Sequence, residues 1–426
     1  MVWAWWSDLA VSGGIKCAVP RRLKFDMGHP YPDALERRGE HAAVRRVGTV
    51  EGKLSKLQSV ELIRFLAAFS IVLHHYGLYF FFNSPDDLPL SPVLVVFSNY
   101  GSYAVNWFWV LSGYVFFFNY RSALTSKTVT GFEFFSNRFA RLYPLHLATL
   151  LAVSLLLLLY DGLFGSEYPL FTTGVTFGTF VSHLFMASNW ASSEFTLNGP
   201  VWSVSVEVLV YFLFYVLTKY GDIAGIAKVL SIAATCFGVS YYFAAQQESG
   251  PPFWIAECAT CFYLGGAVYE VRKHYALDIF EGARQVLFWT VLAVILFVFC
   301  WFLPTYALAF CLPTSAILFI VSSDVIEKSR FVAKMARAGN WTYSSYLLHF
   351  PIALLIVIGV RLAGFDILTI AKQPAFLIIY CVSVFALADF CYTFFEAPAC
   401  RALRLIAKKH MQIAGRELSV RPGLTR

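Results

Sequence analysis

The feature that most constrains this chain is an apolar stretch at residues 57–82 that carries ionisable side chains in its interior. The stretch is long enough to cross a bilayer, because a spanning helix needs about 20 mostly apolar residues. Within it lie Glu61, Arg64, His74 and His75. Ionisable groups in a span are costly and usually face the protein interior or a water-filled cavity. The stretch therefore predicts a helix of a membrane bundle that carries a functional site.

Helical geometry sorts these side chains. Arg64 and His75 are about three turns apart, so they share one face and lie about 16 Å apart along the helix axis. Glu61 precedes Arg64 by one turn on the same side, whereas His74 points about 100° away. A neutral imidazole in a dry cavity is a competent general base. The alternative is that the two histidines lie at the outer headgroup level and only anchor the helix.

Composition indicates an integral membrane protein. The chain is 58% hydrophobic and 14% charged, whereas soluble domains contain about 25% charged residues. The net charge of +7 does not indicate nucleic acid, since the basic residues lie at the termini and between spans, where they report orientation. Cys258 and Cys261 form a CxxC inside a span without a second cysteine or histidine pair, which favours packing over zinc. No metal is expected.

The hydropathy pattern predicts an all-α fold, a polytopic integral membrane bundle of about ten transmembrane helices. A segment near residues 171–190 is rich in Thr, Gly, Ser and His and is interpreted as re-entrant or interfacial. Counting it as an eleventh span would place the later basic loops outside, against the positive-inside rule. The spans are expected at residues 57–82, 93–118, 143–160, 201–219, 226–246, 253–271, 285–303, 305–323, 342–361 and 374–396.

Three regions are predicted in one membrane-embedded unit without internal repeats. Residues 1–56 are polar and basic and are interpreted as a cytoplasmic, largely disordered extension, with a later start at Met27 as an alternative. Residues 57–400 form the membrane domain, and residues 401–426 form a basic tail of the kind found at an inner leaflet. Both termini are expected in the cytoplasm, with the chain in the inner (cell) membrane.

A second set of polar groups follows in NGPVWSVSVEVLVYF. Asn198 is expected to cap the helix and Pro200 suits its first turn. Ser203, Glu207 and Tyr211 follow at four-residue spacing and share a face. A buried carboxylate needs a partner, and a histidine or arginine on a neighbouring span is the natural one. The alternative is an ion pair that only ties helices together.

Two further segments carry candidate site residues. Ser345 precedes His349 by one turn, and this histidine is either structural or part of a site. Arg138 and Arg141 share a face at the predicted cytoplasmic entry of the third span. Arginine forks suit phosphate recognition, although two arginines at a cytoplasmic helix end also serve topology alone.

Together these segments resemble the membrane acyltransferase-3 family over about residues 57–400. In that family the paired-arginine segment usually opens with a double basic residue, whereas Asn137 precedes Arg138 here. The matching elements are, in chain order, Arg64 with His75, Ser112–Gly113–Tyr114, Arg138 with Arg141 and Pro144, Trp202–Ser203 with Ser205 and Glu207, Tyr343 to His349, and Glu396 with Pro398.

The resemblance implies transfer of an acyl group, most often acetyl, from cytoplasmic acyl-CoA to a hydroxyl of a lipid-linked or surface polysaccharide. His75 is then the expected base or acyl carrier, with Glu207 or Glu61 orienting it and His349 as a further catalytic residue. The expected partners are membrane lipid and a glycan or glycolipid acceptor, and assembly as a homodimer is left open. The residues expected to contact CoA are Arg64, Arg138, Arg141, Ser112, Trp202 and Ser203.

Two other classes of function fit the same side chains. Intramembrane histidine and carboxylate groups also make proton relays, so a proton-coupled transporter or flippase for a glycolipid or small molecule is the alternative. Many secondary transporters show internal repeats, which are not found here. A membrane scaffold without activity is the third interpretation, and bound CoA would separate the enzyme from both.

Overall fold

The computed structural model describes residues 58–165, 168–170, 176–221, 223–275, 305–321 and 329–420. Within these ranges the chain is helical without strands, which confirms the predicted all-α fold. The main helices are α3 (Gln58–Tyr79), α4 (Ser91–Tyr100), α5 (Ala104–Phe116), α6 (Ser122–Thr125), α7 (Gly131–Phe164), α8 (Phe177–Leu184), α9 (Val201–Tyr220), α10 (Ile226–Ala245), α11 (Pro251–Tyr275), α13 (Thr305–Val321), α15 (Arg330–Met335), α16 (Thr342–Leu362), α17 (Ile367–Ala371), α18 (Pro374–Cys391) and α19 (Ala397–Val420).

Several helical runs have the length and composition of membrane spans, which confirms the polytopic bundle. The expected span at residues 285–303 lies outside the described residues, so the predicted total stays a prediction. Runs long and apolar enough to cross a membrane are Gln58–Tyr79, Gly131–Phe164, Val201–Tyr220, Ile226–Ala245, Arg330–Leu362 and Pro374–Ile413.

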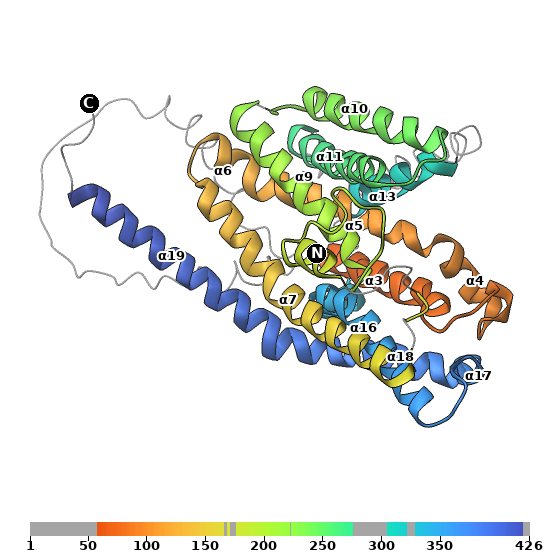
Figure 1. Ribbon diagram of the computed structural model, residues 1–426. Coiled ribbons are helices and arrows are strands. Elements are labelled where there is room, and N and C mark those ends of the chain that lie inside the picture. The colour runs from red at the N-terminus through yellow and green to blue at the C-terminus, as the bar shows by residue number, and fades with distance from the viewer. Residues whose placement is uncertain are drawn as a thin grey trace, which may run out of the picture.

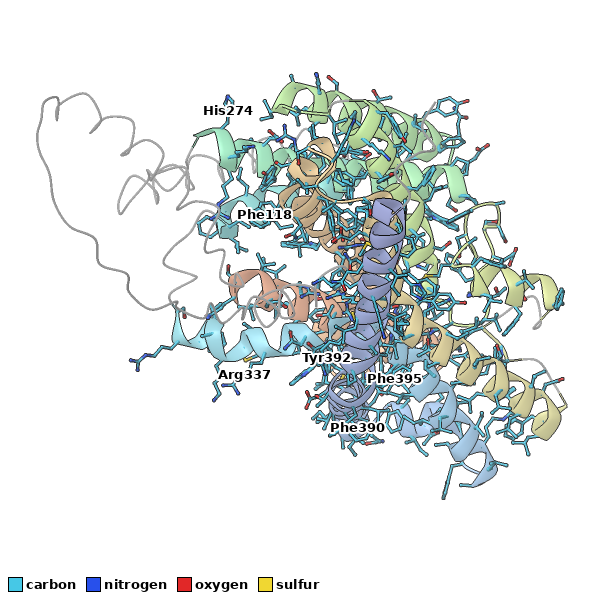
Figure 2. All side chains as sticks on the ribbon, turned by 90° about the vertical axis from the view of Figure 1, so that its left-hand side faces the viewer. Phe118, His274, Arg337, Phe390, Tyr392 and Phe395 are labelled. Carbon is cyan, nitrogen blue, oxygen red and sulfur yellow. The ribbon has the colours of Figure 1, made fainter. Side chains whose placement is uncertain are left out.

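The bundle has two sides that meet at α3 and α5. Figure 1 shows α10, α11 and α13 along one side and α7, α16 and α18 along the other. Two aromatic-rich cores match these sides, one around Trp109 and Phe262, the other around Tyr76, Phe350 and Tyr380. Helix α19 continues from α18 through a π-helical turn, Tyr392–Glu396, and extends away from the bundle (Figure 1). The view from that side shows α19 in front of the other helices (Figure 2).

Helices α5 and α11 are in backbone contact, and two glycines permit it. A Cβ atom on Gly113 would lie 1.7 Å from the carbonyl oxygen of Phe262. One on Gly265 would lie 1.9 Å from the carbonyl oxygen of Val110. Small residues that let helix backbones approach closely are typical of membrane helix interfaces. Gly113 therefore explains why the Ser-Gly-aromatic element has a glycine at its centre.

The second predicted span, residues 93–118, is not one continuous helix. It is divided into α4 and α5 by a 3₁₀ turn, Gly101–Tyr103, and α5 continues as a π-helical turn, Phe117–Arg121. A Cβ atom on Gly101 would lie 2.7 Å from the Cβ of His74 on α3. The break therefore lies where the chain passes close against α3, which is a tertiary contact that local sequence does not encode.

The third predicted span, residues 143–160, begins earlier than expected. The hydroxyl of Thr130 accepts a hydrogen bond from the Glu133 backbone N–H at 3.1 Å, as an N-cap does, so α7 starts before the apolar run. Arg138 and Arg141 consequently lie inside the helix, in its second and third turns, and both are buried.

The segment near residues 171–190 contains α8, which has eight residues. A bilayer span needs about 20, so α8 does not cross the membrane as a helix. Thr176 caps it, and the side chains of Phe177 and Phe185 are 84% and 70% exposed. These features fit the predicted re-entrant or interfacial segment.

Candidate functional site

Two histidines from distant parts of the chain meet in the middle of the bundle. His75 on α3 places Nδ1 3.2 Å from Nε2 of His349 on α16. Tyr79, one turn after His75, stacks on its ring with centroids 5.2 Å apart. The Tyr79 hydroxyl lies 3.2 Å from the same His349 Nε2. His75 and His349, predicted separately as candidates, thus belong to one cluster.

The hydrogen bonds assign the tautomers of both rings. His349 Nδ1 lies 3.1 Å from the backbone carbonyl of Ser345. A carbonyl only accepts, so Nδ1 carries the proton and Nε2 is the acceptor. Both His75 Nδ1 and the Tyr79 hydroxyl lie 3.2 Å from this Nε2 and can donate to it. With Nδ1 protonated, the His75 Nε2 lone pair is available as a base.

A cavity of about 370 Å³ adjoins this pair. Its lining includes His75, Tyr79, Trp202 and Tyr346. Pockets of about 300–1,000 Å³ hold small ligands, so this one has room for a reacting group and part of an acceptor. Trp202, which the resemblance assigned to CoA contact, lies here beside His75 and not among the arginines.

His74 has a different role from its neighbour. Its Nδ1 lies 2.9 Å from the carbonyl oxygen of Ser98 and 3.1 Å from that of Phe97, both on α4. The ring therefore ties α3 to α4, and it also lines the cavity beside His75.

The start of α9 is fixed against α16 beside the cavity. The Tyr346 hydroxyl donates to the Pro200 carbonyl at 2.8 Å and lies 2.6 Å from the Ser203 hydroxyl. Asn198 does not cap α9, so that prediction was wrong. Its Nδ2 donates to the Leu347 carbonyl at 3.1 Å instead, because the helix begins after Pro200 and Asn198 faces α16.

Glu207 lies deeper in the bundle. Its Oε1 accepts a 2.5 Å hydrogen bond from the Ser112 hydroxyl on α5. With Ser203, Trp109 and Tyr346 it lines a small void of about 10 Å³, the volume of about one water. The structure therefore groups Ser112, Ser203 and Glu207 together, whereas the hydrogen-bond partner that orients His75 is His349.

The arginines form a separate cluster at the other end of α3. Arg64 donates to Glu61 at 2.5 Å, and neither side chain is exposed. Arg141 pairs with Glu396, whose other oxygen accepts a hydrogen bond from Ser344 on α16. Arg64 and Arg141 also interact electrostatically. Two spans and the end of α18 thus bring buried cations together on one side of the membrane domain.

Arg138 is held by aromatic groups. Its Nη2 donates to the Tyr120 hydroxyl at 2.6 Å, and its guanidinium carbon lies 4.5 Å from the centroid of the Phe116 ring. Arginine stacks on aromatic faces in this way. Arg138 and Arg141 are therefore both held by side chains of neighbouring elements, and their assignment to CoA stays a prediction.

Comparison with known proteins identifies the family to which the chain belongs. The family model for the acyltransferase domain of the acyltransferase-3 family matches residues 57–393. The chain belongs to this family. It is a membrane acyltransferase that transfers groups other than aminoacyl groups.

One relative is the acyltransferase MdmB of Streptomyces mycarofaciens. It is 26% identical over 336 residues, which cover 73% of this chain and 82% of the relative. No solved structure matches this acyltransferase significantly.

The sequence analysis did not predict the contacts that three residues make in this candidate site. Tyr79 was identifiable in principle, because it follows His75 by one turn and so shares its face. Glu396 was noted only as part of a closing Glu-x-Pro element, and its pairing with Arg141 is a tertiary contact. Tyr346 follows Tyr343 on α16 and lines both cavities, which no local pattern indicates.

Proposed function

We propose that this acyltransferase moves an acyl group, in the first place acetyl, from cytoplasmic acyl-CoA to a hydroxyl of a lipid-linked or surface polysaccharide. The observation that carries the proposal is the hydrogen-bonded pair of His75 and His349, which presents His75 Nε2 as a base beside a cavity. The protein is expected in the inner membrane with both termini in the cytoplasm, as its basic loops indicate.

The acyl transfer follows from the assigned tautomers. His75 Nε2 takes the proton of the acceptor hydroxyl as its oxygen bonds to the thioester carbonyl carbon. The resulting imidazolium donates through Nδ1 to His349 Nε2, which stabilises it as the third member of a triad does. The carbon–sulfur bond then breaks, the thiolate receives the proton from His75, and free CoA and the acyl ester leave. The Tyr79 hydroxyl also lines the cavity, and it would have to turn from His349 Nε2 to donate to the oxyanion.

The size of the cavity supports a single ring as the group that enters. About 370 Å³ is near the lower end of the range for small-molecule sites, so a polysaccharide would present one sugar while the rest remains outside. Trp202 and Phe195 both line the cavity, with ring centroids 6.0 Å apart. Rigid aromatic walls suit a cyclic acceptor.

The arginine cluster supports a phosphate-bearing donor. Arg64 and Arg141 are buried, and Arg138 presents a guanidinium between aromatic rings. Arginine forks bind phosphate oxygens with two parallel hydrogen bonds. Because Arg64 lies about 16 Å from His75 along α3, a phosphate held there would leave an extended arm to carry the thioester toward the base.

The test is turnover of labelled acetyl-CoA by the purified protein with a glycan or glycolipid acceptor pool. Wild type is compared with His75→Ala and with His274→Ala, an exposed histidine at the end of α11. Transfer should fall by about 10²–10⁴ in His75→Ala and persist in the control. Transfer that survives in His75→Ala would overturn the base assignment, and a folded wild type that neither binds CoA nor transfers acetyl would refute the function.

A further inference from the structure

The cavity beside His75 has walls without a permanently charged side chain. Among the described residues that line it, none is Arg, Lys, Asp or Glu. The polar lining side chains are Ser102, Tyr79, Tyr346 and the histidines His74 and His75. The other lining side chains are aliphatic or aromatic. This lining offers hydrogen bonds to hydroxyl groups but no counter-ion to an anionic group.

Aromatic rings from different segments build one wall of the cavity. Trp202 of α9 packs on Trp254 of α11 with ring centroids 5.3 Å apart, and Trp109 of α5 meets it edge-on at 5.8 Å. Phe195, in the loop before α9, also lies 5.3 Å from Trp254. Trp254 is 8% exposed and supports the wall from behind, whereas Phe195 is 46% exposed. Phe195 therefore lines the cavity and keeps part of its ring surface open to a ligand.

The loop that carries Phe195 is held by hydrogen bonds next to that residue. The Thr196 hydroxyl lies 3.2 Å from His183 Nε2 on α8, and the His183 carbonyl accepts a 2.7 Å hydrogen bond from His146 Nε2 of α7. Asn198 donates to a backbone carbonyl of α16 at 3.1 Å. The loop is thus tied to α7 and α16, so Phe195 is presented from a fixed segment. A ring held in this way loses little conformational entropy when a ligand stacks on it.

We propose that the group which enters this cavity is an uncharged sugar ring and that Phe195 selects it by stacking on its apolar face. The inference rests on the proposed function and names the substrate class of the same site. An anionic ring, such as a uronic acid or a sugar phosphate, would lose hydration in the cavity without gaining a cation. A neutral ring places its C–H groups against the aromatic wall, and its hydroxyls find partners in Ser102 and Tyr346.

The first experiment varies only the charge of the acceptor. Labelled acetyl-CoA is offered with neutral glycans and with uronic-acid glycans, the latter before and after their carboxylates are converted to amides. At pH 8, where imidazoles are neutral, kcat/KM for the amidated glycans should exceed that for the acidic ones at least about 100-fold, because the carboxylate would be buried unpaired. Equal use of the two, or acetyl found by tandem mass spectrometry on a uronic-acid or phosphate-bearing ring, would overturn the neutral acceptor. Transfer to the neutral glycans alone would support it.

The second experiment tests Phe195 with a matched control. Phe195→Ala is compared with Phe185→Ala, because Phe185 is 70% exposed in the same segment and does not line the cavity. Phe195→Ala should raise KM for the neutral acceptor about three- to tenfold, the effect of one aromatic contact, and leave KM for acetyl-CoA unchanged. Phe195→Tyr, which keeps the ring, and Phe185→Ala should both match wild type.

The outcomes separate the inference from the function. An unchanged acceptor KM in Phe195→Ala would overturn the role of Phe195 while the function stands. An equal rise in KM for acetyl-CoA and acceptor, with a lowered unfolding temperature, would show that Phe195 only supports the fold and would also overturn that role. A folded wild type that binds no CoA and acetylates none of the glycans would refute the proposed function, and the inference with it.

Discussion

Replacing His349 by phenylalanine tests whether this side chain acts through His75. The change keeps an aromatic ring in the site but removes both nitrogens. His349 Nε2 is the acceptor for His75 Nδ1 at 3.2 Å, and it lies within 3.2 Å of the Tyr79 hydroxyl. Without that acceptor, His75 loses its fixed tautomer and the group that stabilises its protonated form. The reaction should slow although the base itself is present.

The expected magnitude follows from the type of hydrogen bond. A hydrogen bond to a charged group contributes about 1.5–3 kcal/mol, and each 1.4 kcal/mol is about tenfold in rate. The His75–His349 distance of 3.2 Å is long for such a bond, so the lower half of that range applies. His349→Phe should therefore lower kcat about 10- to 50-fold. His75→Ala, which removes the base, should lower kcat by a factor of about 10²–10⁴.

The assay is acetyl-CoA turnover in detergent or nanodiscs, with label on the acceptor and released CoA followed together. The decisive sample is the double variant His75→Ala/His349→Phe, since residues that act as a unit are not additive. It should be no slower than His75→Ala alone. His349→Gln, whose side-chain oxygen can accept from His75, should retain most of the activity. If the double variant is slower than His75→Ala by the same factor that separates His349→Phe from wild type, His349 acts independently and the tautomer argument fails.

Two variants test the frame that holds the site. Gly113→Ala should lower the unfolding temperature strongly, because the new Cβ would lie 1.7 Å from the Phe262 carbonyl oxygen and force α5 from α11. The control Gly162→Ala, with open space around it, should unfold at the wild-type temperature. Equal unfolding temperatures of the two variants would refute the contact. Glu396→Gln should lower the free energy of unfolding by about 3–5 kcal/mol, because it leaves the buried Arg141 without its carboxylate. Adding Arg141→Gln should restore part of that free energy. A double variant whose loss is the sum of the two single losses would contradict the pairing.

The sequence predicted the parts of the site that depend on one helix. The common face of Arg64 and His75 follows from helical periodicity, as does the position of Glu61 one turn from Arg64. The pairing of Glu61 with Arg64 was not predicted, since Glu61 was expected to orient His75. The position of Ser345 one turn before His349 is confirmed in the same way, although the group that contacts the ring is its backbone carbonyl. Local spacing was sufficient wherever both partners share a helix.

The rest depends on contacts between distant segments. His75 and His349 are brought together by the packing of α3 on α16, which no spacing in the chain encodes. Positive-inside counting placed Arg138 and Arg141 at a helix entry but gave no indication that both side chains are buried. Tyr120 and Glu396 come from other helices, and each gives one of these cations a hydrogen-bond or ion-pair partner that the sequence of α7 does not encode.

The arginine cluster and the histidine pair lie at different depths along α3. Arg64 lies about 16 Å from His75 along α3, so a donor whose phosphates bind there, as proposed, would reach the base from the arginine side. The void beside Glu207 holds about one water, whereas the cavity at His75 holds about 370 Å³. Tyr346 lines both. A thioester arm is larger than one water, so a donor that passed through the void would displace Tyr346 or Trp109 from its lining. The hydrogen bonds of Tyr346 to Pro200 and Ser203 hold its side chain between the two spaces.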